Sequence, residues 1–506
     1  MKVCVIHRRI YTGEAVAGTV TVRTEPNFGT PKCCIVVYME ADANINAYDT
    51  ATAIRNFGIG FTGPAGDGSG NINSFCQYQS MADNVTTTAG RKQNQNTRFI
   101  VAHNATGTNY YQCTAVSFSA DTASLTFTAT TPQTNIDLDC MFIFFTGSDL
   151  TVGCGMLAMN TASAGTASVS NLIFAPDCVI ASFNSTALNT GVNYTTNVEP
   201  RICFGAAVRL PTSTQKCIGY RVDFGTTRAD YTYYDNNSIA GHLTSATVWG
   251  DYNLTTWASN GFTVTSNNTS AVNNLMWMAL KGQSGNDFML VDLTSATATG
   301  NQYNYFGTTG SRVQAVIGGI VGATANNTVA NTTPDCESFN VFASQRATPP
   351  LTIGAGTATS TTGTTAVTGS STTFRDLRQG DIIYNLAGTT IGTVSSVASN
   401  TSLTLAANGA VAITNAQFTF SKPNQYCFTY GMFDGGTAAT QVFSRVSSTA
   451  IVVSRTTGVD QVIGSVSDYD TRPGFNVNYT TASTAVSRGW VLGFKDNDRS
   501  RRRSFD

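Results

Sequence analysis

Three stretches of the chain share one pattern, in which a polar turn is followed by a mostly apolar strand. They read NFGTPKCCIVVY at Asn27–Tyr38, IFAPDCVIASF at Ile173–Phe183 and TGSRVQAVIGGIV at Thr309–Val321. Short runs that are continuously apolar and rich in β-branched residues are typical of strands covered on both faces. The pattern therefore predicts a β-protein built from three copies of one unit.

Three further elements follow the first one in the same order in each copy. The second reads NFGIGFTG, ICFGAAV and CFTYGMFDG, and the third reads FCQYQSMADN, KCIGYRVDFG and VFSRVSSTAI. The fourth joins an alternating strand to an aromatic one, as in SLTFTAT followed by CMFIFFTG. Alternation with period two indicates strands with one wet face, and sheets of this kind pack into sandwiches. We therefore predict an all-β fold of three repeated β-sandwich-like units.

The third copy is longer than the others, and the excess falls on a stretch with strand patterns of its own, among them GDIIYNL and GTTIGTVSSV. Prolines flank this stretch, and proline ends strand ladders. We therefore expect a small inserted β-module there. The expected division is an N-terminal arm with sandwich unit 1 over 1–159, unit 2 over 160–296, unit 3 over 297–350 and 423–498, the inserted module over 351–422, and an Arg-rich C-terminal arm over 499–506.

Charged residues are scarce in this chain. Lys and Arg number 29 and Asp and Glu 30, so that 12% of the residues are charged and the formal net charge is −1, where about 25% is usual. A balanced charge argues against nucleic acid as a partner. No apolar run is long enough to cross a membrane, and MKVCVIHRR has too short an apolar core for a secretory signal. We expect neither a nucleic-acid nor a membrane partner.

Residue types that carry chemistry form no recognisable motif. The twelve cysteines show neither CxxC pairs nor zinc spacing, and most lie in apolar strand patterns. We interpret them as small buried side chains, with disulfides as the alternative. The three histidines lie near no GxSxG elbow, and acidic pairs such as Asp137 with Asp139 fit solvated loops better than a glycosidase cleft. We predict no catalytic, cofactor-binding or metal-binding residue, no cofactor and no enzymatic activity.

Two groups of residues are candidates for contacts with other molecules. The Arg-rich end is predicted to be an assembly arm that binds carboxylates of a neighbouring subunit, and Met1–Arg9 is assigned the same role. Aromatic residues near polar loops are candidates for stacking on a sugar or a protein, although packing inside the sandwich is the favoured alternative. The candidate assembly contacts are Arg499, Arg501, Arg502 and Arg503, and the candidate surface aromatics are Tyr231, Tyr233, Trp249 and Trp257.

The inserted stretch RDLRQGDIIYNLAGTTIGTVSSVASNTSLTLAANGAVA resembles small β-modules embedded in tailed-phage virion proteins. The repeated units, especially GFTVTSNNTSAVNNLMWMALKG, are similar to β-sandwich repeats of phage tail and fibre-associated proteins. The heptads, collagen-like triplets and β-helix repeats of a shaft-type fibre are absent from the sequence.

This resemblance implies a non-enzymatic structural component of a tailed-phage virion, an external tail, collar or fibre-associated protein that contributes to assembly or host attachment. It implies location in the virion, after assembly in the host cytoplasm. The expected partners are other virion structural proteins, further copies of the chain and a host surface glycan. Two alternatives remain, a capsid decoration protein that stabilises the head and a carbohydrate-binding or carbohydrate-active surface protein.

Overall fold

The described part of the chain is built almost entirely of strands. Its regular structure consists of β-strands and one 3₁₀ turn, η1 (Phe374–Asp376), and it contains no helix suited to crossing a membrane. The computed structural model describes residues 1–11, 17–40, 54–82, 90–103, 109–128, 137–160, 162–184, 192–194, 201–223, 229–244, 247–267, 274–284, 286–306, 312–322, 328–330, 336–346, 351–433, 441–456, 459–469 and 474–495.

Unit 1 is a sandwich of two antiparallel sheets. The inner sheet, which faces the centre of the molecule, has the order β1 (Lys2–Ile10), β10 (Leu138–Thr146), β3 (Cys33–Glu40), β4 (Ile54–Pro64), β5 (Ile72–Ala82), β6 (Gly90–Gln95) and β14 (Val192–Tyr194). The outer sheet has the order β2 (Ala17–Arg23), β9 (Thr122–Thr128), β8 (Asn109–Ser119) and β7 (Val101–His103).

Unit 2 repeats this arrangement strand for strand. Its inner sheet has the order β11 (Thr151–Ala158), β21 (Asn274–Lys281), β13 (Cys178–Asn184), β15 (Arg201–Val208), β16 (Thr214–Asp223), β17 (Ala229–Asp235) and β25 (Thr328–Ala330). Its outer sheet has the order β12 (Thr166–Val169), β20 (Gly261–Ser266), β19 (Thr247–Ala258) and β18 (Ala240–Thr244).

Unit 3 has the same order again. Its inner sheet consists of β22 (Phe288–Thr294), β40 (Arg488–Lys495), β24 (Val313–Val321), β26 (Cys336–Gln345), β35 (Gln425–Phe433) and β36 (Gln441–Ser447). Its outer sheet consists of β23 (Gly300–Tyr305), β39 (Gly474–Thr481), β38 (Val459–Asp468) and β37 (Ile451–Thr456). The all-β fold of three repeated sandwich-like units is thus confirmed.

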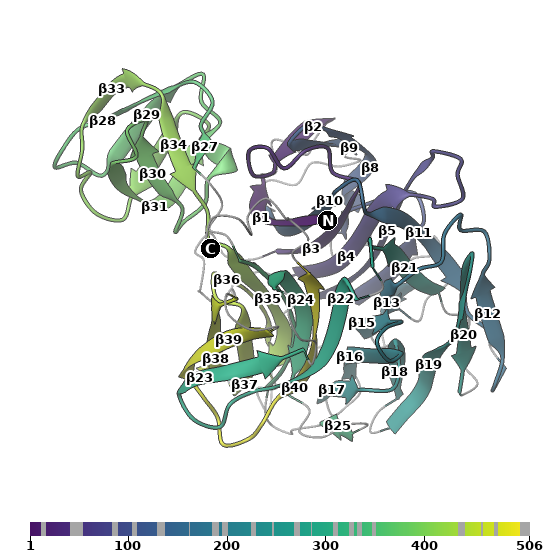
Figure 1. The fold of residues 1–506 in the computed structure, drawn as a ribbon. Helices are drawn as coiled ribbons and strands as arrows, with labels where there is room; N and C mark the ends of the chain where they lie inside the picture. Colours follow the sequence, from purple (N-terminus) through teal and green to yellow (C-terminus); the bar gives the residue numbers. More distant parts are fainter. Residues whose placement is uncertain are drawn as a thin grey trace, which may run out of the picture.

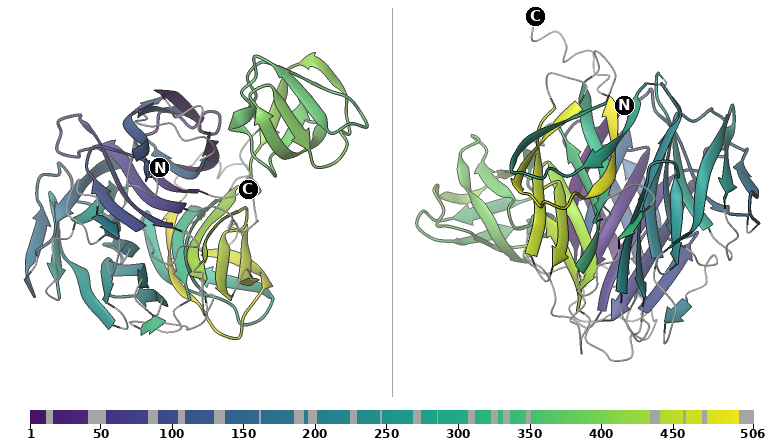
Figure 2. Two further views of the ribbon diagram at one scale, coloured as in Figure 1. Left: turned by 180° about the vertical axis from the view of Figure 1, so that it is seen from behind. Right: turned by 90° about the horizontal axis from the view of Figure 1, so that it is seen from below.

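The inserted module lies between β26 and β35 and projects to one side of the three units (Figures 1 and 2). Because β33 runs on into β34, the sheet curls around a single small core of its own. Its strand order is β27 (Thr352–Ile353), β34 (Phe418–Ser421), β30 (Ile382–Asn385), β31 (Thr390–Ser399), β32 (Ser402–Leu405), β29 (Ala366–Ser370), β28 (Thr357–Ser360) and β33 (Ile413–Ala416).

The inner sheets of the three units surround one shared core. In β3, alternate residues such as Cys33 and Ile35 point into this shared core, whereas Cys34 and Val36 point into the core of unit 1. Because side chains alternate across a strand, a strand between two cores must be apolar at every position. This arrangement explains the continuous apolar run of the sequence, and it makes the three units one body.

Direct contacts join each unit to the next. The indole Nε1 of Trp490 donates to the carbonyl of Phe204 at 3.1 Å between units 3 and 2. The Val5 amide donates to Gln345 Oε1 at 2.7 Å between units 1 and 3. Short strands are also exchanged, since β14 extends the inner sheet of unit 1 from a connection of unit 2 and β25 extends that of unit 2 from unit 3.

The structure corrects three details of the sequence analysis. In the third copy, the strand equivalent to β4 and β15 is β26. The stretch CFTYGMFDG lies mostly in β35, which is equivalent to β5 and β16, and so it is the third element and not the second. The stretch VFSRVSSTAI contains most of β36, which is equivalent to β6 and β17, and so it follows the third element. Because β11 pairs with β21 and β22 pairs with β40, β11 is the first strand of unit 2 and β22 the first strand of unit 3. Units 2 and 3 thus begin before the expected boundaries at residues 160 and 297. Residues Lys2–Ile10 form no arm, because β1 pairs with β10 along its whole length and is buried after its first residue.

Candidate functional site: the junction between the body and the inserted module

A cluster of ionisable side chains lies where the inserted module meets unit 1. Among the described residues, no group of His, Cys, Asp or Glu is arranged to hold a metal ion. This cluster is therefore the best-defined site for analysis. We call it the junction, and its charged or titratable members are His7, Arg8, Arg9, Asp137, Asp139, Asp376, Arg378, Asp381 and Lys422.

Asp139 on β10 is the centre of the junction and is fully buried. Its Oδ2 accepts hydrogen bonds from Arg378 Nη2 of the module at 3.0 Å and from Arg9 Nη1 at 3.4 Å. Its Oδ1 accepts from His7 Nε2 at 2.9 Å. Burial alone would raise the pKa of Asp139, but Arg378, Arg9 and His7 outweigh it and hold this pKa below its usual range. Asp139 is therefore ionised and binds one arginine of unit 1 and one of the module.

His7 on β1 is a neutral member of the junction. Since the Asp139 carboxylate can only accept, the proton of the imidazole lies on Nε2. The ring lies 5.1 Å from the ring of Tyr426 in unit 3. Burial lowers the pKa of His7 below its ordinary value, and Asp139 opposes the shift only in part. His7 therefore contacts unit 3 as well as Asp139 of its own unit.

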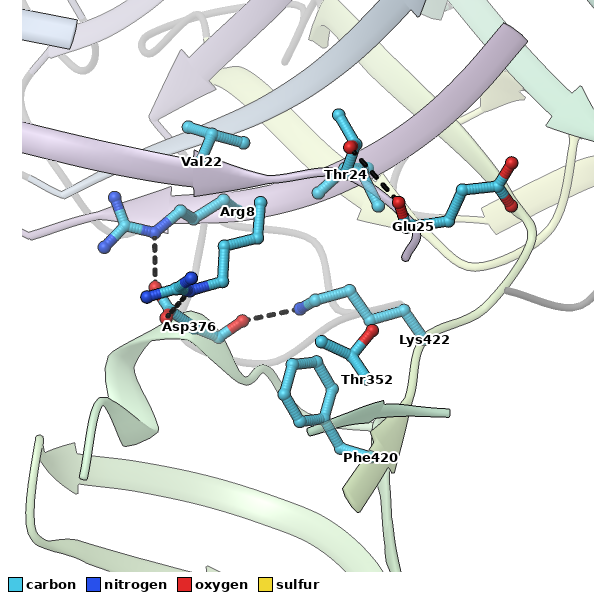
Figure 3. Close-up of a pocket in the computed structure, with 10 residues that line it drawn as sticks. Arg8, Val22, Thr24, Glu25, Thr352, Asp376, Phe420 and Lys422 are labelled. Atoms are coloured by element: carbon cyan, nitrogen blue, oxygen red, sulfur yellow. Dashed lines mark hydrogen bonds and ion pairs between the residues drawn. The ribbon is translucent and has the colours of Figure 1, made fainter. Parts of the chain in front are cut away.

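A second set of contacts joins η1 to β1 of the body and to the end of β34 within the module. Arg8 Nε donates to Asp376 Oδ1 at 3.0 Å, and Thr373 Oγ1 donates to Asp376 Oδ2 at 2.7 Å. Lys422 Nζ donates to Asp381 Oδ2 at 2.9 Å and to the Asp376 carbonyl at 2.6 Å. Figure 3 shows Arg8, Asp376 and Lys422 at a small pocket. Ile6, Val22 and Phe420 are the apolar residues that line it.

Local structure explains why these side chains converge. On β1, alternation sends His7 and Arg9 toward Asp139 and sends Arg8 to the opposite face, where Asp376 lies. In the module, the Arg378 amide donates to Asp381 Oδ2 at 2.9 Å, and this turn continues through a left-handed Gly380. The turn therefore holds Arg378 and Asp381 close together in the module.

The arrangement is that of a docking interface. The apolar core of the module is a cluster separate from the cores of the body, and buried ion pairs join the two parts. Buried ion pairs contribute little net stability because desolvation offsets their attraction, but they penalise any orientation that leaves a charge unpaired. The junction therefore fixes how the module is oriented on the body.

The junction gives stability a defined pH dependence. In the unfolded chain His7 titrates near its ordinary pKa of about 6.5, whereas its pKa in the folded protein is lower. Below pH ~6.5 the unfolded state therefore binds a proton that the native state does not, and stability falls with falling pH. Asp139, with its lowered pKa, contributes stability above its ordinary pKa that is lost only in strong acid.

We expect His7→Gln to abolish the first of these losses and to keep the second. Gln retains an N–H donor for Asp139 but does not titrate. The measurement is the free energy of unfolding in urea from pH 7.5 down to the acid limit for both proteins. Identical profiles for His7→Gln and the parent chain would contradict the assignment of the first loss to His7.

The predicted contact residues are placed as follows. Tyr231 and Tyr233 are buried in the core of unit 2, and the Tyr233 hydroxyl donates to Asp235 Oδ2 at 2.8 Å; they are core residues and not surface contacts. Trp257 is half-buried against the same core, and its Nε1 donates to Ser213 Oγ at 3.0 Å. The Trp249 side chain and the candidate assembly contacts Arg499, Arg501, Arg502 and Arg503 lie outside the described residues.

The cysteines with described side chains are eleven free, buried thiols. Burial raises the pKa of the Cys76 thiol to about 12 and that of Cys178 well above its usual value. A thiol that stays protonated is a poor nucleophile. We therefore expect these eleven cysteines to resist iodoacetamide in the native protein and to react once it is unfolded, as read residue by residue by mass spectrometry. Rapid native labelling of Cys76 would contradict this.

Known proteins give no further guide to the junction: no family model, no curated protein and no solved structure matches this chain. The sequence analysis did not single out the junction. A usable signal existed in the two charge-rich runs HRR at 7–9 and RDLRQGD at 375–381, which stand out in a chain with few charges.

Proposed function

We propose that the chain is a non-enzymatic structural component of a tailed-phage virion, an external protein of the tail, collar or fibre apparatus. The observation that carries the proposal is the single body made of three equivalent sandwiches around one shared core. Such a body suits a scaffold with a pseudo-threefold arrangement, and the module lies to one side of it (Figure 2). The sequence resemblance to phage tail and fibre-associated proteins agrees with this role.

Labelling of purified particles tests this proposal. Antibody fragments raised against the module, which projects from the body, are expected to mark the tail, collar or fibre region in electron micrographs. Few labels per particle are expected for an appendage, whereas many labels over the head would favour the decoration alternative. Particles that carry none of the chain would refute both.

The Arg-rich end supplies a second test. As an assembly arm, 499–506 binds carboxylates of a neighbouring virion protein. Deleting these residues is expected to reduce the amount of chain in purified particles, measured by quantitative mass spectrometry, while the soluble chain keeps its melting temperature. Undiminished incorporation would remove the arm from the proposal.

A further inference from the structure

The outer face of unit 3 carries two tyrosine side chains next to each other. Tyr303 and Tyr305 are two positions apart on β23, and their ring centroids lie 6.4 Å apart with the ring planes at 34°. Strand pairing places Asn476 of β39 opposite Tyr303 and Asn478 opposite Asn301, and residues directly opposite point to the same face of a sheet. We call this surface the tyrosine face, and it comprises Asn301, Tyr303, Tyr305, Asn476 and Asn478.

The tyrosine face points away from the core of unit 3. In β39 the alternate residues Phe475 and Val477 belong to that core, so the residues between and beside them point outward. Tyr305 is 49% exposed. The ring of Tyr303 rests against Gly474, where a Cβ would lie 2.8 Å from its Cζ. Because the outer sheet of unit 3 lies at the periphery of the body (Figure 1), a partner can reach both rings.

The sandwich fold does not require aromatic residues at these two positions. The strands β2 and β12 occupy the same place in units 1 and 2 as β23 does in unit 3. The residues that correspond by strand pairing are Thr21 and Arg23 in unit 1 and Ser168 and Ser170 in unit 2. An aromatic ring left in water where another unit has a small polar residue gives up the benefit of burial. The two tyrosines therefore indicate a contact with another molecule.

The tyrosine face offers amide groups beside its rings and no charge of its own. An asparagine side chain carries two N–H donors and a carbonyl acceptor, and three asparagines accompany the two rings. The strands β23 and β39 read GNQYNY and GFNVNYTT, without a charged residue. In β38 the residue paired with Asn476 is Asp468, and a negative residue at this position disfavours an anionic partner.

We propose that the tyrosine face binds a neutral glycan, an inference that rests on the proposed external position of the chain in the virion. The apolar C–H face of a sugar ring stacks on an aromatic ring, and its hydroxyl groups exchange hydrogen bonds with amides. An apolar protein surface would instead leave the buried amides without partners, which is costly. A single contact on an open sheet is weak, and several copies held on one particle bind a glycan surface more strongly.

Binding of the purified full chain to an array of immobilised neutral oligosaccharides and their sulfated counterparts tests this proposal. We expect binding to neutral oligosaccharides and weaker binding to the sulfated ones. Tyr305→Ala should lower the signal about tenfold, the usual effect of losing one aromatic anchor of an interface, and Tyr305→Phe should retain it because the ring remains. The matched control is Ile173→Ala, which removes an apolar side chain that is 69% exposed on unit 2; it should bind like the parent.

Two results would overturn the proposal. One is a parent chain that binds no neutral oligosaccharide of the array; if Tyr305→Ala then also lowers the amount of chain in purified particles, the tyrosine face is a contact with a virion protein. The other is a Tyr305→Ala variant that binds as the parent does while its circular dichroism shows it to be folded. Labelled particles without glycan binding would refute the glycan site alone, and glycan binding by a chain absent from particles would refute the virion role alone.

Discussion

Asp139→Ala is expected to lower the free energy of unfolding by about 3–5 kcal/mol, the cost of removing one partner of a buried ion pair. Asp139 is fully buried, and the side chains of Arg378 and Arg9 beside it are 5% and 10% exposed. Without the carboxylate, the Arg378 guanidinium would keep its desolvation cost and lose the Asp139 charge that offsets it, whereas Arg9 would keep its ion pair with Asp137. Urea denaturation at pH 7 measures the change.

Asp67→Ala is the matched control for this substitution. Asp67 lies in the exposed turn after β4, where it accepts from the Ser69 amide at 2.9 Å, so its removal should leave the unfolding midpoint unchanged. A double-mutant cycle with Arg378→Ala adds a readout across the interface, since residues in contact show a coupling energy of about 0.5–3 kcal/mol. A cost for Asp139→Ala as small as that of Asp67→Ala would show that the junction is hydrated and does not hold the module.

The sequence was sufficient to predict the strands and their repetition because their causes are local. The runs CCIVVY and LTFTAT differ in period, and this difference separates strands between two cores from strands with a wet face. The inserted module was visible for the same reason, as an excess of length with its own strand pattern. The third copy was misassigned because this local information was missing there. The inserted module separates β26 from β35 in the sequence, so the short spacing that identifies neighbouring strands in the other two copies is lost.

The sequence could mark the charge-rich runs of the junction but could not show that they meet, because its members come from four distant segments. His7 and Arg9 meet Asp139 only through the pairing of β1 with β10, and Arg378 reaches them from the module. The exchanged strand β14 is equally hidden, since three residues in a polar connection carry no strand signal of their own. The acidic pair Asp137 and Asp139 is not a solvated loop pair, because Arg9 binds both.

The shared core implies that the three units unfold together. Phe57 of unit 1 is fully buried, and its ring lies 5.6 Å from that of Phe339 and 5.2 Å from that of Tyr430, both in unit 3. Tyr220 of unit 2 lies 6.3 Å from Phe339. Each unit therefore completes its inner face only with side chains of its neighbours, and a unit alone would expose that face to water.

Phe57→Ala is accordingly expected to cost about 3–5 kcal/mol, the usual penalty for emptying a buried phenylalanine site. It should shift the whole body in a single calorimetric transition, while the module, with its separate core, melts on its own. The matched variant is Phe475→Ala, since Phe475 is equally buried but lies within the core of unit 3. With a shared core, both variants lower the melting temperature of one body transition. If Phe475→Ala instead split off a separate transition and left the rest of the body unshifted, the units would be independent and the common core would not bind them.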